Sequence, residues 1–151
     1  VLFGVTDIPY SRFQEKPQQG EGAVPLIPID ALAGFGSGDF SIDTIQKEDW
    51  FVIPELEKVD FLARVKGDSM IPSFNSGDLV ACRKIQTDTF IQWNKPHLID
   101  TIDQGLMVKR VKKGSAGHIV AVSDNSNYDP FEIPKEQIRG LAIIVGGVFF
   151  E

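Results

Sequence analysis

The fold of this chain is decided by the segment HLIDTIDQGLMVKRV, which spans residues 97–111. Two apolar runs flank Asp103-Gln104-Gly105, and a short connection that ends in glycine is typical of a β-hairpin. In the second run, strand alternation places Met107, Lys109 and Val111 on one face. The segment therefore predicts two antiparallel strands, with a lysine on an otherwise apolar face.

Similar short runs of apolar or alternating residues recur along the chain. Fourteen Gly and nine Pro interrupt the 151 residues and leave little room for a long helix. We predict an all-β fold, a compact domain in which helix is confined to brief turns near residues 54–57 and 134–137. The further candidate strands are residues 60–66, 79–82, 118–122 and 141–145.

Composition and charge narrow the class of protein. A chain of 16.7 kDa with 42% hydrophobic residues has the size and balance of one globular domain. Its apolar runs are too short for a membrane-spanning helix. The net charge of -6 and the pI near 4.9 disfavour contact with phosphate backbones. We therefore expect this piece of the protein to bind neither a membrane nor nucleic acid.

The first residues differ from the rest of the chain. Residues 14–22 are polar and charged, so we interpret residues 1–22 as a linker and residues 23–151 as the folded domain. The first residues lack the features of a secretory signal. The sequence begins with Val1 rather than Met, so we expect it to be a piece of a longer protein. A single cysteine, Cys82, excludes an internal disulfide and favours a cytoplasmic location.

Few residues of the types that catalyse reactions or bind metals occur in a recognisable pattern. The sequence has no glycine-rich phosphate loop and no cluster of Cys and His. His97 and His118 lie within strand patterns, so we expect no metal site. We expect Cys82 to be a small core residue and Asp78 to hold its turn by accepting backbone N–H groups.

A serine and a lysine form the best candidate for catalysis. The motif Gly67-Asp68-Ser69-Met70 follows a predicted strand, which places Ser69 on a tight turn where the backbone N–H groups of Asp68 and Ser69 can bind an oxyanion. Lys109 can act as the base only if burial lowers its pKa. The alternative is that Ser69 caps a turn and Lys109 points to water.

The motifs resemble those of the LexA-like self-cleaving repressors, the S24 peptidase family of LexA, phage CI-type repressors and UmuD. The likeness extends over residues 23–148 in the order of the family, with Lys109 lying 40 residues after Ser69. It implies a β-clip fold, a catalytic dyad of Ser69 and Lys109, and no cofactor. The resembling segments are residues 65–72 and 76–80 for the nucleophile, 107–111 for the lysine strand, 123–130 for a late turn and 138–142 for the closing strand.

The resemblance also implies that the substrate is the chain itself. Members of the family cut a bond between small residues, typically Ala-Gly, upstream of the serine, and Ala33–Gly34 lies 35 residues before Ser69. The alternative is a glycine-rich loop, because Gly34, Gly36 and Gly38 alternate there.

The partners implied by the resemblance complete the prediction. They are a second copy bound through the apolar C-terminal strand, residues 138–150, a recombinase filament as activator, and operator DNA bound by a preceding helix-turn-helix domain that this sequence lacks. We predict the self-cleaving and dimerising C-terminal domain of a LexA-like or phage-repressor-like transcriptional regulator. The alternatives are a non-cleaving dimerisation module and a UmuD-like polymerase accessory protein.

Overall fold

The computed structural model describes residues 23–36, 47, 49–53, 58–86 and 90–150, and these form one mixed nine-stranded sheet ordered β2-β1-β3-β4-β9-β5-β6-β7-β8. Helix in this part is limited to two 3-10 turns, and no helix there could span a membrane. The all-β prediction is confirmed and agrees with the implied β-clip fold. The elements are β1 Ala23–Leu26, η2 Ile29–Ala31, β2 Asp49–Val52, β3 Phe61–Arg64, β4 Leu79–Ile85, β5 Lys95–Thr101, β6 Gly105–Lys113, β7 His118–Val122, β8 Phe131–Pro134, η4 Lys135–Gln137 and β9 Ile138–Val148.

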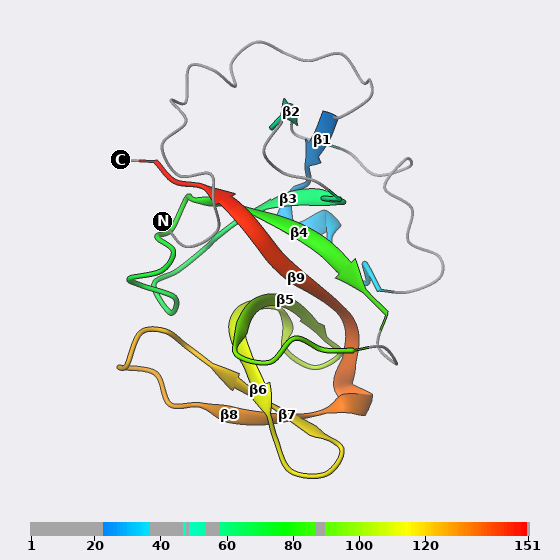
Figure 1. Ribbon diagram of the computed structural model, residues 1–151, viewed down its shortest axis with the longest axis vertical. Coiled ribbons are helices and arrows are strands. Elements are labelled where there is room, and N and C mark those ends of the chain that lie inside the picture. The colour runs from blue at the N-terminus through cyan, green and yellow to red at the C-terminus, as the bar shows by residue number, and fades with distance from the viewer. Residues whose placement is uncertain (1–22, 37–46, 48, 54–57, 87–89, 151) are drawn as a thin grey trace.

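The strand β9 lies at the centre of the sheet and joins its two halves. It runs from the half that contains β5–β8 into the half that contains β1–β4 (Figure 1). Its residues 141–148 pair with β4 and its residues 138–143 pair with β5, both antiparallel. The C-terminal strand through which we expect a second copy to bind is therefore not a free edge over its whole length, because residues 141–143 are paired on both sides.

The predicted hairpin is present as β5 and β6. The two strands pair from Lys95 opposite Val111 to Thr101 opposite Gly105. Gly105 has a φ of +71°, which a glycine adopts without strain, and Thr101 Oγ1 donates to its carbonyl oxygen at 2.9 Å. The hairpin prediction is confirmed with its turn in the expected place.

The other predicted strands and helical turns agree with the observed elements to different extents. The predicted strand at residues 118–122 coincides with β7, and the predicted helical turn at 134–137 corresponds to η4. The strand predicted at 141–145 is part of the longer β9. The predicted linker at residues 1–22 and helical turn at 54–57 lie outside the described residues.

The hydrophobic core consists of three clusters, and β6 lies between two of them. Leu106 and Val108 pack against the first cluster, which includes Phe61 and continues into the segment 27–35. Val111 belongs to the third cluster, whose residues come from β5–β9, and Met107 packs against it. The predicted alternation along this strand is therefore confirmed.

Two residues that we expected to be structural are structural. The carboxylate of Asp78 accepts the N–H of Asn75 at 2.8 Å and the N–H of Phe150 at 3.3 Å. Cys82 is completely buried, and this burial, with a smaller contribution from Asp60, raises the pKa of its thiol. Cys82 therefore stays protonated and acts as a core residue.

Replacing Phe61 by Ala tests whether the first cluster supports the fold. The ring of Phe61 is fully buried and packs edge-to-face on Phe35, with 5.7 Å between the ring centroids. We expect the free energy of unfolding to fall by about 3–5 kcal/mol, measured by urea denaturation. The control is Phe90→Ala, because Phe90 is 86% exposed; an equal loss in both variants would contradict the assignment.

Candidate active site

Ser69 lies in the turn that follows β3, and its neighbours hold that turn in place. Gly67 turns the chain with a φ of +82°, in the left-handed region that favours glycine. The side chain of Met70 is buried in the first core cluster, and its carbonyl oxygen accepts the N–H of Phe74 at 2.9 Å. Ser69 itself is half-buried, so its position is set by anchored residues on either side.

A second turn, residues 123–128, contacts the Ser69 turn directly. The backbone N–H of Asn125 donates to the carbonyl oxygen of Ser69 at 2.9 Å, and its Nδ2 donates to the carbonyl oxygen of Asp68 at 3.0 Å. The hydroxyl of Tyr128 donates to the carboxylate of Asp68, and this hydrogen bond raises the pKa of the Tyr128 phenol. The sequence singles out this turn by resemblance, but it does not indicate these contacts.

An ion pair braces the second turn. Arg110 donates to the carboxylate of Asp124 through Nε and Nη2, each at 2.9 Å, in a bidentate arrangement. Asp124 also accepts the hydroxyl of Ser73, four residues after Ser69. Burial acts to raise the pKa of Asp124, but the hydrogen bonds from Arg110 and Ser73 outweigh it and hold that pKa below its usual value. Asp124 thus connects β6 to the helical turn that begins at Ser69.

Lys109 lies on β6 with its amine directed at the same second turn. The residue is only 9% exposed, and Nζ donates to Ser123 Oγ at 2.8 Å. Nζ also lies 5.7 Å from the centroid of the Tyr128 ring. Burial lowers the pKa of the Lys109 amine, since the charged form loses hydration. The alternative in which Lys109 points to bulk water is therefore wrong.

Ser69 and Lys109 thus reach the same turn from two sides. Asn125 bonds the Ser69 turn, and Ser123, two residues earlier, accepts the amine of Lys109. Lys109 Nζ bonds Ser123 rather than Ser69, whose Oγ has no hydrogen bond to any described residue. The backbone N–H groups of Asp68 and Ser69 also have no partner in this part of the chain, so they can bind an incoming oxygen.

A narrow cleft opens beside Ser69. It has a volume of about 120 Å³ and is lined mainly by apolar side chains, among them Met70, Leu98, Leu106 and Val108. Among the described strands, β6 pairs with β7 only over residues 110–113, so the edge of β6 at residues 105–108 is unpaired on that side. A cleft next to an open strand edge suits the binding of an extended segment.

The predicted scissile bond, Ala33–Gly34, lies in a turn between two buried side chains. Leu32 is 0% exposed and Phe35 is 1% exposed, whereas Ala33 is exposed. The N–H of Gly34 donates to the carboxylate of Asp100 in β5. The structure therefore holds this bond against Asp100 and gives Gly34 no hydrogen bond with the Ser69 turn.

The two histidines lie within β5 and β7, as the strand patterns predict. His97 is fully buried directly opposite Lys109, and burial lowers its pKa to about 4. His118 is half-buried, with Nδ1 2.9 Å from the carbonyl oxygen of Ala116. The described residues contain no group of three His, Cys, Asp or Glu placed to hold a metal ion. His97 therefore adds no positive charge next to Lys109 at neutral pH.

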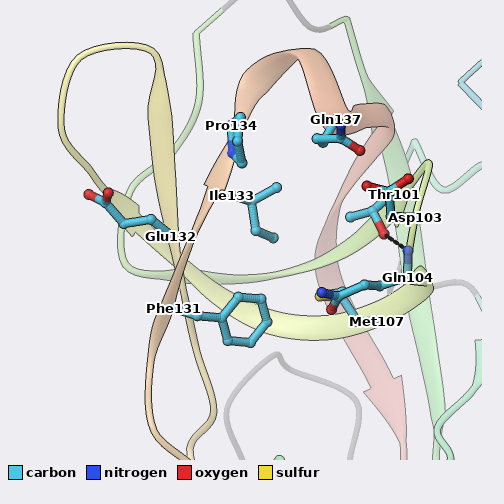
Figure 2. A pocket seen from close by; sticks show the side chains of 9 residues that line it. All are labelled: Thr101, Asp103, Gln104, Met107, Phe131, Glu132, Ile133, Pro134 and Gln137. Carbon is cyan, nitrogen blue, oxygen red and sulfur yellow. Dashed lines mark hydrogen bonds between the residues drawn. The ribbon is translucent and has the colours of Figure 1, made fainter.

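A second pocket lies near the turn of the β5–β6 hairpin. Figure 2 shows the side chains that surround it, including Met107, Phe131, Ile133 and Gln137. Its volume is about 250 Å³. Neither Ser69 nor Lys109 lines it, so it is distinct from the cleft beside Ser69, although Met107 lines both.

A family model described as Peptidase S24-like matches residues 25–147. The matched range begins within β1 and ends one residue before the end of β9, so it includes both Ser69 and Lys109. No curated protein matches the chain.

Replacing Lys109 by Met tests whether the buried amine has a lowered pKa. If the pKa is lower in the folded chain, the unfolded chain binds more protons, and raising the pH stabilises the fold until the amine is neutral in both states. We expect the free energy of unfolding of the wild type to rise relative to that of Lys109→Met between pH 7 and about pH 10. Urea denaturation at several pH values measures this difference.

The matched control for this measurement is Lys112→Met. Lys112 lies on the same strand and is exposed. We expect its substitution to leave the pH dependence of stability unchanged. Parallel pH profiles for the wild type and Lys109→Met would contradict a lowered pKa.

Proposed function

The chain belongs to the Peptidase S24-like family, and we propose that it is a serine peptidase domain that cuts its own Ala33–Gly34 bond. The observation that carries the proposal is the meeting of Ser69 and a buried Lys109 at the turn 123–128. A serine hydroxyl becomes an effective nucleophile only when a neighbouring base takes its proton. A lysine can be that base when burial lowers its pKa, which is the environment of Lys109.

In the proposed reaction, neutral Lys109 takes the hydroxyl proton while Ser69 Oγ forms a bond to the carbonyl carbon of Ala33. The backbone N–H groups of Asp68 and Ser69 donate to the oxyanion. Protonated Lys109 then gives its proton to the nitrogen of Gly34 as the C–N bond breaks. Water hydrolyses the resulting ester, with Lys109 again as the base, and releases Ser69 and a new carboxyl terminus at Ala33.

Two features around the dyad support this chemistry. Ser123 Oγ accepts a hydrogen bond from Lys109 at 2.8 Å, which restrains the amine beside the turn that contacts Ser69. The cleft beside Ser69, at about 120 Å³, is lined by Ser69 itself and has room for the small side chain of Ala33. Because the N–H of Gly34 is bonded to Asp100, the reaction also requires the segment 32–36 to move.

We extend the proposal to the protein as a whole. The domain would be the self-cleaving, dimerising part of a LexA-like or phage-repressor-like transcriptional regulator, with a recombinase filament as the activator. The net charge of -6 favours operator binding by another part of the protein. The alternative is a non-cleaving dimerisation module, and the observation that favours it is the hydrogen bond between Gly34 and Asp100.

Self-cleavage is tested by incubating the purified protein at about pH 10, where the neutral fraction of Lys109 is large. We expect two fragments, residues 1–33 and 34–151, identified by intact mass. Ser69→Ala should abolish cleavage by removing the attacking oxygen, and Lys109→Ala by removing the base. The control, Lys112→Ala, alters an exposed lysine of the same strand and should cut at the wild-type rate.

The rate should be independent of protein concentration, because the bond and the nucleophile lie in one chain. Cutting that persists in Ser69→Ala contradicts the mechanism. An uncut wild-type chain after long alkaline incubation also contradicts it, and favours the non-cleaving dimerisation module.

We also propose a homodimer through the C-terminal strand. In the described part of the chain, β9 pairs with β5 only as far as Ile143, so residues 144–148 have one unpaired edge. Such an edge can pair with a second copy. Val145 is half-buried and packs partly against the core, whereas Ile143 is only 5% exposed, so Val145 has more surface left to contact a partner.

Replacing Val145 by Lys should weaken this dimer, because it adds a charge beside the pairing edge. Analytical ultracentrifugation of the wild type and the variant measures the dissociation constant. The control is Val52→Lys, because Val52 is 44% exposed on β2 at the other end of the sheet order. A wild-type protein that is only monomeric at tens of micromolar would overturn the proposal.

A further inference from the structure

The pocket between β8, η4 and the turn of the β5–β6 hairpin is not lined by Ser69, and we call it the distal pocket. Its volume is about 250 Å³, and its apolar walls include Met107, Phe131 and Ile133 (Figure 2). Sites for drug-sized molecules have volumes of roughly 300–1,000 Å³. The distal pocket therefore has room for a smaller molecule with one ring system.

The walls of the distal pocket are held in place by the fold. The N–H of Ile102 donates to the carbonyl oxygen of Gln137 at 2.9 Å, which ties η4 to the hairpin turn. The N–H of Gln104 donates to Thr101 Oγ1 at 3.1 Å and fixes the shape of that turn. Ile133 is only 5% exposed and belongs to the third core cluster. The pocket is thus largely formed before a ligand binds, as is usual for small-molecule sites.

One polar group of the distal pocket lacks a partner. Oε1 of Gln137 is buried and accepts no hydrogen bond from any described residue. Most buried polar atoms in folded proteins are hydrogen-bonded, because an unsatisfied acceptor has lost its water without gaining a donor. Since Gln137 lines the distal pocket, a ligand bound there can supply the missing N–H group.

The charges around the distal pocket favour a cation. Its lining contains two carboxylates, Asp103 and Glu132, and no Lys, Arg or His. Glu132 already accepts the N–H and the hydroxyl of Ser115, at 2.9 and 3.0 Å. Asp103 is exposed in the hairpin turn, and its carboxylate has no hydrogen bond or ion pair with any described residue. A cation therefore finds an unpaired carboxylate and the 36% exposed ring of Phe131, whereas an anion meets two like charges.

We propose that the distal pocket binds a small aromatic amine in its protonated form, with an N–H group on the ring and an ammonium group on a short side chain. The ring packs on the apolar walls, its N–H donates to Gln137 Oε1, and the ammonium group lies near Asp103. The proposal does not depend on self-cleavage, because neither Ser69 nor Lys109 lines this pocket.

Tryptamine, an indole ring with a protonated amine, is the probe for this site. It is titrated at neutral pH into the full chain carrying Ser69→Ala, which keeps the protein whole, and binding is followed by NMR at the backbone amides of β8 and η4. A ligand of this size should bind with a dissociation constant of about 1 mM or lower. Indolepropionate has the same ring and a negative charge, so its binding should be about fivefold weaker.

Two substitutions test the two polar contacts separately. Gln137→Met removes the amide at similar size, and we expect it to weaken tryptamine binding about tenfold. Asp103→Asn removes the charge, and we expect it to weaken tryptamine binding about threefold and to reduce the preference over indolepropionate. The matched control is Asp30→Asn, because Asp30 is an exposed aspartate of η2 that does not line the pocket. Its affinity for tryptamine should be unchanged.

A second measurement needs no ligand. The side chain of Gln137 loses water on folding and gains no hydrogen bond at Oε1, so the apolar side chain of Met should not destabilise the protein in its place. We expect the free energy of unfolding of Gln137→Met, measured by urea denaturation, to equal or exceed that of the parent chain. A marked loss of stability would show that the protein itself satisfies this amide, and would overturn its assignment to a ligand.

The proposal fails if tryptamine binds elsewhere or does not bind. The absence of a saturable change at β8 and η4 overturns the site. An affinity for tryptamine that neither Gln137→Met nor Asp103→Asn weakens also overturns it. Equal affinities for tryptamine and indolepropionate overturn the preference for a cation. Self-cleavage is measured separately, so the failure of one proposal leaves the other intact.

Discussion

The pairing of β9 with β4 on one edge and β5 on the other is the constraint on which the rest of the structure depends. Within β9, Ile143 lies opposite Arg83 of β4 and also opposite His97 of β5. Since His97 lies opposite Lys109, this row of residues sets the distance of β6 from the half of the sheet that carries Ser69. The turn 123–128 then closes the arrangement by bonding the Ser69 turn on one side and Lys109 on the other.

The electrostatics of the site follow from two neighbours on β6 that face opposite ways. Arg110 donates to the carboxylate of Asp124, whereas the amine of Lys109 donates to the neutral hydroxyl oxygen of Ser123. A carboxylate beside Lys109 would favour its charged form and raise its pKa. By directing the carboxylate to an arginine, which stays protonated, the strand braces the turn and leaves the lysine with a lowered pKa. His97, opposite Lys109, is also buried, and this burial lowers the pKa of its imidazole. The surroundings of both side chains thus disfavour their charged forms.

Local patterns in the sequence account for the hairpin and for the two faces of β6, because alternation and turn glycines act over a few residues. They do not account for β1 and β8, which are four residues long and contain or end in proline. The strands that pair with the two edges of β9 are far from it in sequence. The full length of β9 therefore cannot be predicted from the pattern of neighbouring residues. The contacts of Asn125 with the Ser69 turn and of Gly34 with Asp100 are equally non-local. Residue types and spacing therefore single out Ser69 and Lys109, but not the residues that position them.

In the proposed self-cleavage, the substrate segment lies in the same chain as the nucleophile, which limits how the reaction can be controlled. The effective concentration of the segment at Ser69 is high even if its affinity for the cleft is low. Weak binding alone therefore cannot keep the rate of cleavage low. Two variables can then control the rate of the proposed cleavage: the protonation of Lys109 and the position of the Ala33–Gly34 bond. The protonation of Lys109 depends on burial and pH, and the position of Ala33–Gly34 depends on the hydrogen bond from the Gly34 N–H to Asp100. An activator of the proposed reaction could therefore act on the position of the bond alone, by favouring the segment in the cleft, without altering the chemistry proposed for Ser69 and Lys109.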